Sequence, residues 1–235
     1  MSSAYDAISR VYDPWSRSVT EDVAYYVELA RGAGGPVVEL GVGTGRIAVP
    51  TATAGVSVIG VDSSPGMLDV CRERAELAGV ADLLDLRLGD LCEPPVDERV
   101  QLVTCPFRSL LHLHTDDDRL RALRAAHALL QPGGRFAFDV FEPDDDDVAE
   151  THGRWLEREP EIFERADWDT VARTLTLSVR GPSGASTMAL AWLSAGEWRQ
   201  LLVAAGFEVE SLWGWFDRRP YRGGEDSVWV ARRPG

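Results

Sequence analysis

A glycine-rich turn between a short apolar run and a helical segment constrains the fold of this chain most. Residues 37–40, VVEL, lead into Gly41-Val-Gly43-Thr-Gly45, and a helical stretch follows over 46–54. Glycine lets the backbone of such a turn approach a ligand closely, and the first amides of the following helix are free to donate hydrogen bonds. The pattern therefore predicts a ligand site where the first strand ends.

An acidic residue ends the next apolar run. Residues 56–61 are typical of a strand, and Asp62 follows them, 21 residues after Gly41 (62 − 41). A carboxylate at this spacing can accept hydrogen bonds from both hydroxyls of a ribose. The turn and Asp62 together predict a site for a nucleoside.

Strand-like and helix-like segments alternate through the middle of the chain. Strands are predicted at 37–40, 56–61, 83–88, 100–105 and 135–141, with helices between them. This alternation predicts an α/β fold, a doubly wound parallel sheet with helices on both faces. Right-handed connections then place the loops that follow the strands along one edge of the sheet.

The segments on either side of this core have other patterns. Thr20 is a good N-cap for a helix that glycines end near residue 32. Antiparallel strands are predicted at 161–168, 170–180 and 185–190, then a helix over 194–205, and last strands at 207–216 and 227–231. The run Asp144–Asp147 is predicted to be a solvated, mobile loop.

Composition excludes several classes of protein. The chain has 235 residues, and its 24 basic residues, all arginine, face 38 acidic ones, for a net charge of −14. Without lysine there is no Schiff-base enzyme and no standard P-loop. The three cysteines lie too far apart for a C-x-x-C motif. The negative charge disfavours nucleic acid and anionic membranes as partners.

The cellular location is predicted from what the sequence lacks. The opening residues have no apolar signal region, and no apolar stretch of about 18 residues occurs anywhere in the chain. An odd and sparse cysteine count suits a reducing compartment. We expect a cytoplasmic protein that does not associate with membranes.

The spacing of the glycines bears on the kind of nucleoside. A dinucleotide fingerprint reads G-x-G-x-x-G, because a pyrophosphate must sit on the helix N-terminus. Here the spacing is G-x-G-x-G, and Glu39 stands just before it. An acidic side chain beside the turn is unfavourable for phosphate and suits a cationic ligand. S-adenosylmethionine carries a sulfonium and an ammonium group and no phosphate.

Four segments resemble the class I S-adenosylmethionine-dependent methyltransferases, in particular those that act on small molecules. They are VVELGVGTGRIAVP from residue 37, VIGVDSSPGMLDVC from residue 58, LRLGDL from residue 86 and LLQPGGRFAFDVF from residue 129. The resemblance implies a Rossmann-like seven-stranded sheet whose last strand is antiparallel. It implies N-terminal lid helices over 1–35, a cofactor-binding core over 36–141, an inserted antiparallel substrate roof over 142–193, and a C-terminal helix and strands over 194–235.

The resemblance also implies the residues that bind S-adenosylmethionine and its product S-adenosylhomocysteine. The methionine part would contact the glycine turn, the ribose would contact Asp62, and the lid would close through aromatic side chains. The cofactor-binding residues so predicted are Tyr12, Trp15, Glu39, Gly41, Gly43, Gly45, Asp62, Ser63, Met67, Asp90, Leu91, Cys105 and Phe107.

The loop after the fourth strand lies near the transferred methyl group in this topology. It holds His112, our first candidate for a catalytic base, and His114, our second. The loop lacks the acidic or amide residue that DNA amino-methyltransferases carry after this strand, which argues against a nucleobase substrate. The predicted substrate-binding residues are Arg108, Trp213, Arg218 and Tyr221. His112 and His114 lack the further histidine of a metal motif, so no metal is expected.

The sequence thus predicts a methyltransferase that acts on a nitrogen or oxygen atom of a small molecule. The acceptor and the choice between nitrogen and oxygen stay open, as does the choice between monomer and homodimer. Two alternatives remain. One is an NAD(P)-dependent oxidoreductase on the same kind of sheet, and the other is a non-catalytic protein that binds S-adenosylmethionine.

Overall fold

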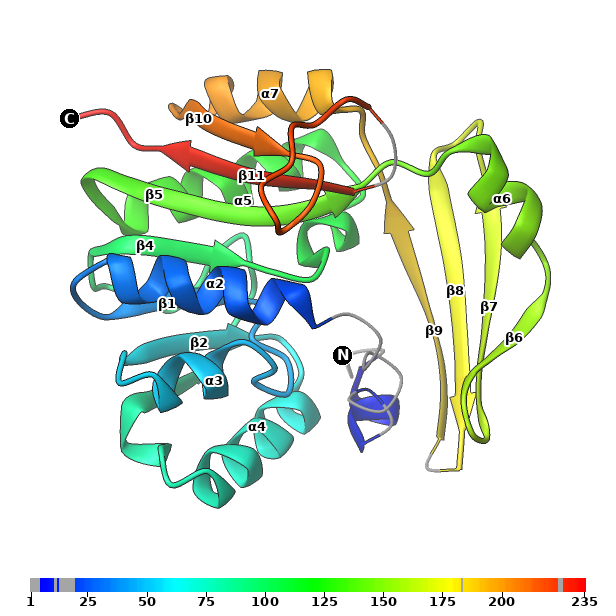
Figure 1. Cartoon of the computed structure of the whole chain (residues 1–235), viewed down its shortest axis with the longest axis horizontal. Coiled ribbons are helices and arrows are strands. Elements are labelled where there is room, and N and C mark those ends of the chain that lie inside the picture. The colour runs from blue at the N-terminus through cyan, green and yellow to red at the C-terminus, as the bar shows by residue number, and fades with distance from the viewer. Residues whose placement is uncertain (1–4, 11, 13–19, 183, 224–225) are drawn as a thin grey trace.

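The computed structural model describes residues 5–10, 12, 20–182, 184–223 and 226–235. Two sheets stand next to each other, with the short helix η1 (Asp6–Ile8) between them (Figure 1). The larger sheet and its helices form the core, and the smaller sheet is built from the segment between residues 155 and 191. No helix in the described part of the chain is both long and apolar enough to cross a membrane.

Seven strands of the described chain form the larger sheet, in the order β10-β11-β5-β4-β1-β2-β3. Their bounds are β1 Val37–Leu40, β2 Val58–Asp62, β3 Leu84–Leu88, β4 Val100–Cys105, β5 Leu130–Phe141, β10 Glu208–Trp213 and β11 Asp226–Arg232. All neighbours are parallel except β11, which is antiparallel to both β5 and β10. The predicted fold class, a doubly wound sheet with an antiparallel last strand, is confirmed.

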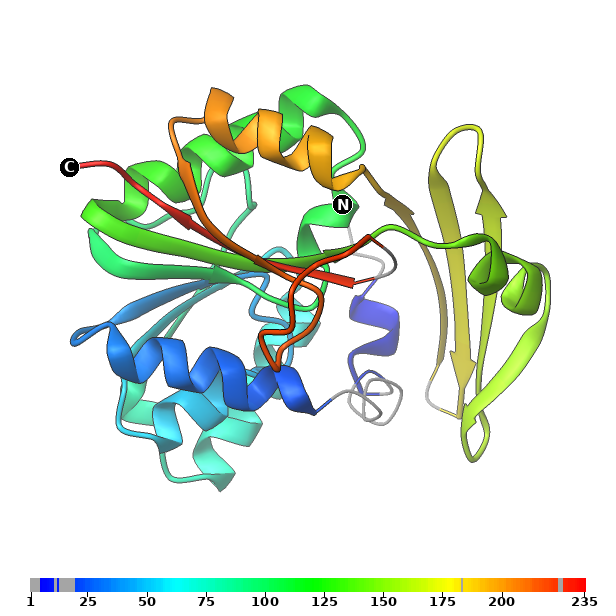
Figure 2. The same ribbon diagram turned by 45° about the horizontal axis from the view of Figure 1, so that its top comes forward.

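Helices cover both faces of this sheet (Figure 2). On one face α2 (Glu21–Gly32), α3 (Ala48–Thr53) and α4 (Pro65–Leu77) contact one another in sequence, and on the other α5 (Asp116–Leu129) packs against α7 (Ala195–Ala204). The N-cap residues of α4, α5 and α7 are Ser64, Thr115 and Ser194, and their side chains accept hydrogen bonds from the first turn, as is typical of these residue types. Thr20 at the start of α2 makes no such bond.

The smaller sheet is antiparallel throughout, in the order β6-β7-β8-β9. Its strands are β6 Trp155–Glu159, β7 Ile162–Asp169, β8 Thr174–Gly181 and β9 Gly184–Ala191. The last three match the predicted antiparallel patch, and β6 extends it by a strand that the sequence did not indicate. The inner end of this sheet joins the main apolar core through Leu175, Leu177 and Leu190.

The prediction of a mobile loop at Asp144–Asp147 is wrong. Residues Asp145–Thr151 form a short helix, α6, between β5 and β6. Asp144 caps this helix by accepting from the Asp147 amide at 2.8 Å, and Asp147 accepts in return from the Asp144 amide. Carboxylates at a helix N-terminus are stabilised by the unpaired amides of the first turn and by the helix dipole. The acidic run therefore starts a helix at Asp145 instead of forming a loop.

The N-terminal segment joins the core to the smaller sheet. The 3-10 helix η1 (Asp6–Ile8) contacts both α4 and β9. The Asp6 carboxylate accepts hydrogen bonds from the Ser64 hydroxyl and, at 3.1 Å, from the Gly66 amide at the start of α4. Two further 3-10 helices are η2 (Ala81–Leu83) and η3 (Ser109–His112), and residues 106–108 connect β4 to η3.

Gly45→Ala should lower the free energy of unfolding by about 2–4 kcal/mol. Gly45 has φ of +77°, and a Cβ there would lie 2.5 Å from Cys71 Sγ and 2.9 Å from Val49 Cγ2, so α3 and α4 would be forced apart. Equilibrium unfolding in urea measures the change.

Gly55→Ala is the matched control. Gly55 also has a positive φ, +87°, but a Cβ there meets nothing within 4 Å. The Gly55→Ala variant should lose about 1 kcal/mol of unfolding free energy, which is the cost of the left-handed backbone alone. Equal losses in the two variants would show that close packing around Gly45 contributes nothing.

Candidate active site

A cavity of about 510 Å³ is lined by residues from both sheets and from the N-terminal segment. The core contributes side chains from the loop after β4 and from the ends of β5 and β11, and the smaller sheet contributes an apolar surface. The lining includes Tyr5, Tyr12, Phe107, Arg108, His112, Phe141, Trp168, Leu175, Leu177, Met188, Leu190 and Asp226. The inserted sheet therefore covers the edge where the parallel strands end.

Acidic side chains outnumber basic ones around this cavity. The described lining includes five carboxylates, those of Asp147, Glu157, Glu159, Glu164 and Asp226, and two guanidinium groups, those of Arg108 and Arg158. Arg108 pairs with Asp226 at 2.8 Å, and Arg158 pairs with Glu164 at 2.8 Å. Three carboxylates thus remain in excess, and the cavity has a negative potential that favours a cation.

The glycine turn lies next to this cavity, at the end of β1. Gly41, Gly43 and Gly45 all have positive φ, of +71°, +54° and +77°. A Cβ on Gly41 would lie 2.6 Å from Ser109 Oγ, so the turn packs directly on η3. A Cβ on Gly43 would meet nothing within 4 Å, so open space faces the turn at that point. The positive φ angles and the open space at Gly43 leave room for the close approach to a ligand that the sequence predicts.

Asp62 ties the end of β2 to the glycine turn. Its carboxylate accepts hydrogen bonds from the Gly43 amide at 2.8 Å and from the Ser64 amide at 2.9 Å. Glu39, at the end of β1, is buried, and burial raises its pKa to about 8, while Arg46 opposes the shift. Burial also raises the pKa of Asp62. Two poorly solvated carboxyl groups therefore converge on the turn, where a positive ligand would stabilise their charged forms.

His112 forms a hydrogen-bonded pair with Tyr5 at the cavity wall. The Tyr5 hydroxyl and His112 Nε2 are 2.8 Å apart, and the two rings meet edge to face. Burial, with a smaller contribution from His114, lowers the pKa of His112 to about 4. At neutral pH the imidazole is therefore uncharged and can accept a hydrogen bond. The sequence predicted His112 at this position, and Tyr5 was not among the predicted site residues.

The structure does not bring His114 to the cavity. Its ring is exposed, and Nε2 is 3.1 Å from the carbonyl oxygen of Ala189 on β9. Two residues after His112, the chain has already left η3 and turned outward toward α5. His114 therefore links the core to the smaller sheet, and its position does not support a catalytic role.

Three predicted substrate residues also lie elsewhere. Trp213 and Arg218 line a second hollow of about 340 Å³, together with Tyr25 and Leu29 of α2. Arg218 is bound there to Glu28 at 2.9 Å. Tyr221 is half-buried, and burial, helped by the nearby Glu142, raises the pKa of its hydroxyl. Trp213 ends β10, the edge strand of the larger sheet, and Arg218 and Tyr221 follow it; none of the three lines the larger cavity.

The other predicted cofactor residues surround the turn and the neighbouring strand ends. Met67 is buried in the first turn of α4, Ser63 is exposed beside Asp62, and Cys105 is buried at the end of β4. Asp90 is exposed and accepts from the Cys92 amide at 2.7 Å. Leu91 lies within 4.0 Å of the Gly41 position. Trp15 lies outside the described residues.

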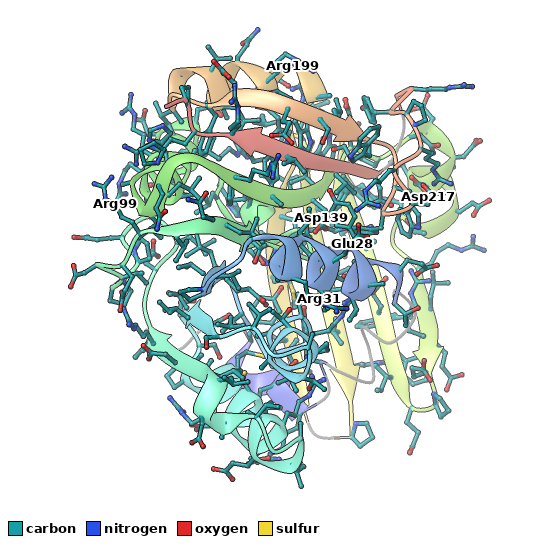
Figure 3. The ribbon with its side chains drawn as sticks, turned by 60° about the vertical axis from the view of Figure 1, so that its left-hand side comes forward. Glu28, Arg31, Arg99, Asp139, Arg199 and Asp217 are labelled. Carbon is teal, nitrogen blue, oxygen red and sulfur yellow. The ribbon has the colours of Figure 1, made fainter. Side chains whose placement is uncertain are left out.

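A buried carboxylate that the sequence did not single out holds the loop after β4. Asp139, on β5, accepts from the Phe107 amide at 2.8 Å, the Arg108 amide at 3.1 Å and the Tyr26 hydroxyl at 2.6 Å. Figure 3 places Asp139 close to α2, the helix that carries Tyr26. In the sequence, the segment FAFDVF gives only one signal, a charged residue inside an otherwise apolar strand.

Comparisons with known proteins agree with this geometry. Residues 37–134 match the family described as "Methyltransferase domain". The cypemycin N-terminal methyltransferase of a Streptomyces species is 26% identical over 230 residues, which cover 93% of this chain and 89% of that protein. Both sets of matched residues include the glycine turn and the ends of β2 and β4.

Solved structures are similar over the whole chain. The CcbJ methyltransferase from Streptomyces caelestis superimposes with a TM-score of 0.85 at 28% identity, covering 100% of this chain and 99% of that one. CalS10, an amino pentose methyltransferase from Micromonospora echinaspora solved with S-adenosylmethionine bound, has the same fold, with a TM-score of 0.68 at 22% identity over 99% and 98% of the two chains. These findings favour methyl transfer over the oxidoreductase alternative.

The pKa of His112 predicts how stability depends on pH. The folded-state pKa is about 4 and the ordinary value about 6.5, so below pH 6.5 the unfolded chain binds a proton that the folded chain does not. This proton uptake should lower the stability of the wild type by about 2–3 kcal/mol between pH 7 and pH 4. The His112→Gln variant should not show that part of the loss, as urea unfolding at each pH would measure.

His114→Gln is the control for this prediction. Burial is the larger cause of the low pKa of His112 and His114 the smaller one, so the His114→Gln variant should keep most of the wild-type loss. Parallel curves for the wild type and His112→Gln would contradict the lowered pKa of His112.

Proposed function

Because the chain is a class I S-adenosylmethionine-dependent methyltransferase, we propose that it methylates an amine nitrogen of a small molecule bound in the larger cavity. The observation that carries this proposal is the lining of the cavity. An apolar surface and an excess of carboxylates surround an uncharged His112. The names of the cypemycin N-terminal and amino pentose methyltransferases, which are similar to this chain, also support an amine.

The residues around the glycine turn fit S-adenosylmethionine. The positive φ angles bring the backbone close, and the open space at Gly43 leaves room for a ligand. Glu39 would lie toward the ammonium end, and Asp62 would accept from the ribose hydroxyls with the lone pairs that its two backbone bonds leave free. Met67 and Leu91 would provide the apolar surface for the adenine. No group in this set requires a phosphate.

When bound, S-adenosylmethionine supplies a methyl group that is activated by its positive sulfur. Transfer to nitrogen is an in-line displacement, so the chain's task is to orient the amine and exclude water. Tyr12 and Phe107 meet edge to face, with ring centroids 6.2 Å apart, and both line the cavity. They would form the wall between the turn and the acceptor.

The acidic lining would select an acceptor that is positively charged in water. Glu159 is half-buried at the cavity, and no hydrogen bond or ion pair joins its side chain to another described residue. A carboxylate held in this way favours a cation and repels an anion. The carboxylates of the smaller sheet would therefore attract the amine, while the methyl transfer itself would take place beside His112.

The Tyr5–His112 pair would orient the amine for attack. A protonated amine must first release one proton to solvent water, because His112, with a pKa of about 4, cannot hold it. The methylated product carries one further proton, which it releases to water after it leaves the cavity. His112 is uncharged at neutral pH and hydrogen-bonded to the Tyr5 hydroxyl, so the pair can accept an N–H hydrogen bond and turn the lone pair away from itself. Burial keeps the Tyr5 hydroxyl protonated by raising its pKa.

Asp62→Ala should weaken the binding of S-adenosylhomocysteine by about 100-fold. The variant removes the acceptor of the predicted ribose hydrogen bonds, each worth about 1.5 kcal/mol or more when one partner is charged. Isothermal titration calorimetry measures the dissociation constant. Asp85→Ala, on the exposed side of β3, is the control and should bind as the wild type does. Wild-type affinity in Asp62→Ala would refute the assignment.

The proposed reaction is tested with methyl-labelled S-adenosylmethionine and a matched panel of small acceptors. Amino sugars, amino acids and peptides with free N-termini are compared with phenols and sugar alcohols of similar size. We expect label to transfer to amines, and His112→Ala to lower kcat on the best amine by about 100-fold. The affinity for S-adenosylhomocysteine should stay unchanged in this variant.

His114→Ala is the matched histidine control and should keep kcat within about threefold, since its ring does not line the cavity. Label transfer to phenols and to no amine would overturn the choice of nitrogen. Binding of S-adenosylhomocysteine without transfer to any compound would favour the non-catalytic alternative.

A further inference from the structure

We infer that Asp139 is a positioning residue for methyl transfer: its carboxylate holds the loop after β4 in the conformation that places Phe107, Arg108 and His112 at the cavity. Asp139 is buried and does not itself line the cavity. This inference rests on the proposed function, because it takes the cavity as the acceptor site.

The loop has a conformation that its residues do not favour by themselves. Phe107 and Arg108 are consecutive, and their φ angles are +55° and +64°. Residues with a Cβ rarely adopt this left-handed region, and two in succession need an outside restraint. The restraint here is Asp139, because both left-handed residues donate their amides to its carboxylate, at 2.8 and 3.1 Å.

The direction of these two peptide units decides where the cavity side chains lie. Phe107 is carried against Arg46, whose guanidinium stands 4.4 Å from the ring centroid, and toward Tyr12. Arg108 is carried to the other side, where it pairs with Asp226 and lies over the Phe141 ring. Two consecutive left-handed residues turn the chain sharply, so both side chains stay at the cavity wall, whereas in an extended chain they would point to opposite sides.

The same restraint determines where η3 begins. Arg108 is the N-cap residue of η3, and the Ser109 hydroxyl turns back to the Pro106 carbonyl oxygen at 2.8 Å. His112 ends this helix, one turn later. A change in the peptide after Arg108 would therefore move His112 away from Tyr5.

The chemistry of the three donors requires a carboxylate at this position. The Phe107 amide and the Tyr26 hydroxyl reach one carboxylate oxygen, and the Arg108 amide reaches the other. A carboxylate can accept on both oxygens, whereas an amide of the same shape must present its NH₂ group to one side. In Asp139→Asn, the side-chain NH₂ group must face at least one of these donors, so a hydrogen bond is replaced by two N–H or O–H groups that point at each other. The volume of the side chain hardly changes.

Amide hydrogen exchange of the full chain tests the inference first, because it needs no acceptor. In the wild type the Phe107 and Arg108 amides should exchange at least 100-fold more slowly than in an unstructured peptide. In Asp139→Asn their exchange should be at least tenfold faster. Tyr26→Phe, which removes the third donor and leaves both loop bonds, should keep it within threefold. Unprotected amides in the wild type would overturn the inference without any variant.

Kinetics on the best amine of the acceptor panel completes the test. Asp139→Asn should lower kcat at least tenfold, while the KM for S-adenosylmethionine and the Kd for S-adenosylhomocysteine stay within threefold. A merely structural role would weaken the binding of both ligands together with kcat, and that result, or an unchanged kcat, would overturn the inference. A wild type that methylates no amine would refute the proposed acceptor class, whereas the exchange rates judge Asp139 independently.

Discussion

The backbone turn between β1 and α3 passes through positive φ at three glycines, and the central part of the fold is arranged around it. The amides of Gly41 and Val42 both donate to the Val61 carbonyl oxygen, and the Gly43 amide donates to the Asp62 carboxylate. The lack of a side chain at Gly41 admits η3, and its lack at Gly45 admits α4. The ends of β1, β2 and β4 can therefore meet closely around one space.

The smaller sheet turns this strand edge into an enclosed site. An open edge of parallel strands exposes its ligands to water, and catalysis of group transfer is favoured when water is kept out. The inserted strands cover the edge with apolar side chains from β8 and β9, and η1 fills the gap between β9 and α4. The insertion also brings the excess of carboxylates, so the part of the chain that encloses the acceptor also sets the charge it meets.

Buried charges hold the elements of the core around this site together. Asp22 on α2 is buried and accepts from Arg46, which stands over Phe107, and Asp139 accepts from Tyr26 on the same helix. Burial raises the pKa of Asp22 to about 6, while Arg46 opposes the shift. Each of these carboxylates accepts hydrogen bonds from a different element, so α2, the glycine turn and the loop after β4 hold one another in place.

The sequence by itself determined the doubly wound core, the glycine turn, Asp62 and the loop with His112, because these follow from local patterns of apolar residues, glycine spacing and strand order. Tertiary structure decided what local patterns cannot express. In the sequence, Asp139 is only a charged residue within a buried strand. Its role depends on the Phe107 and Arg108 amides, which the fold places within hydrogen-bonding distance. His112 and His114 are only two positions apart in sequence, yet His112 lines the cavity and His114 contacts β9, because η3 ends at His112. Trp213 and Arg218 lie beside α2, since the side of the sheet that a late strand's end reaches depends on packing and not on composition.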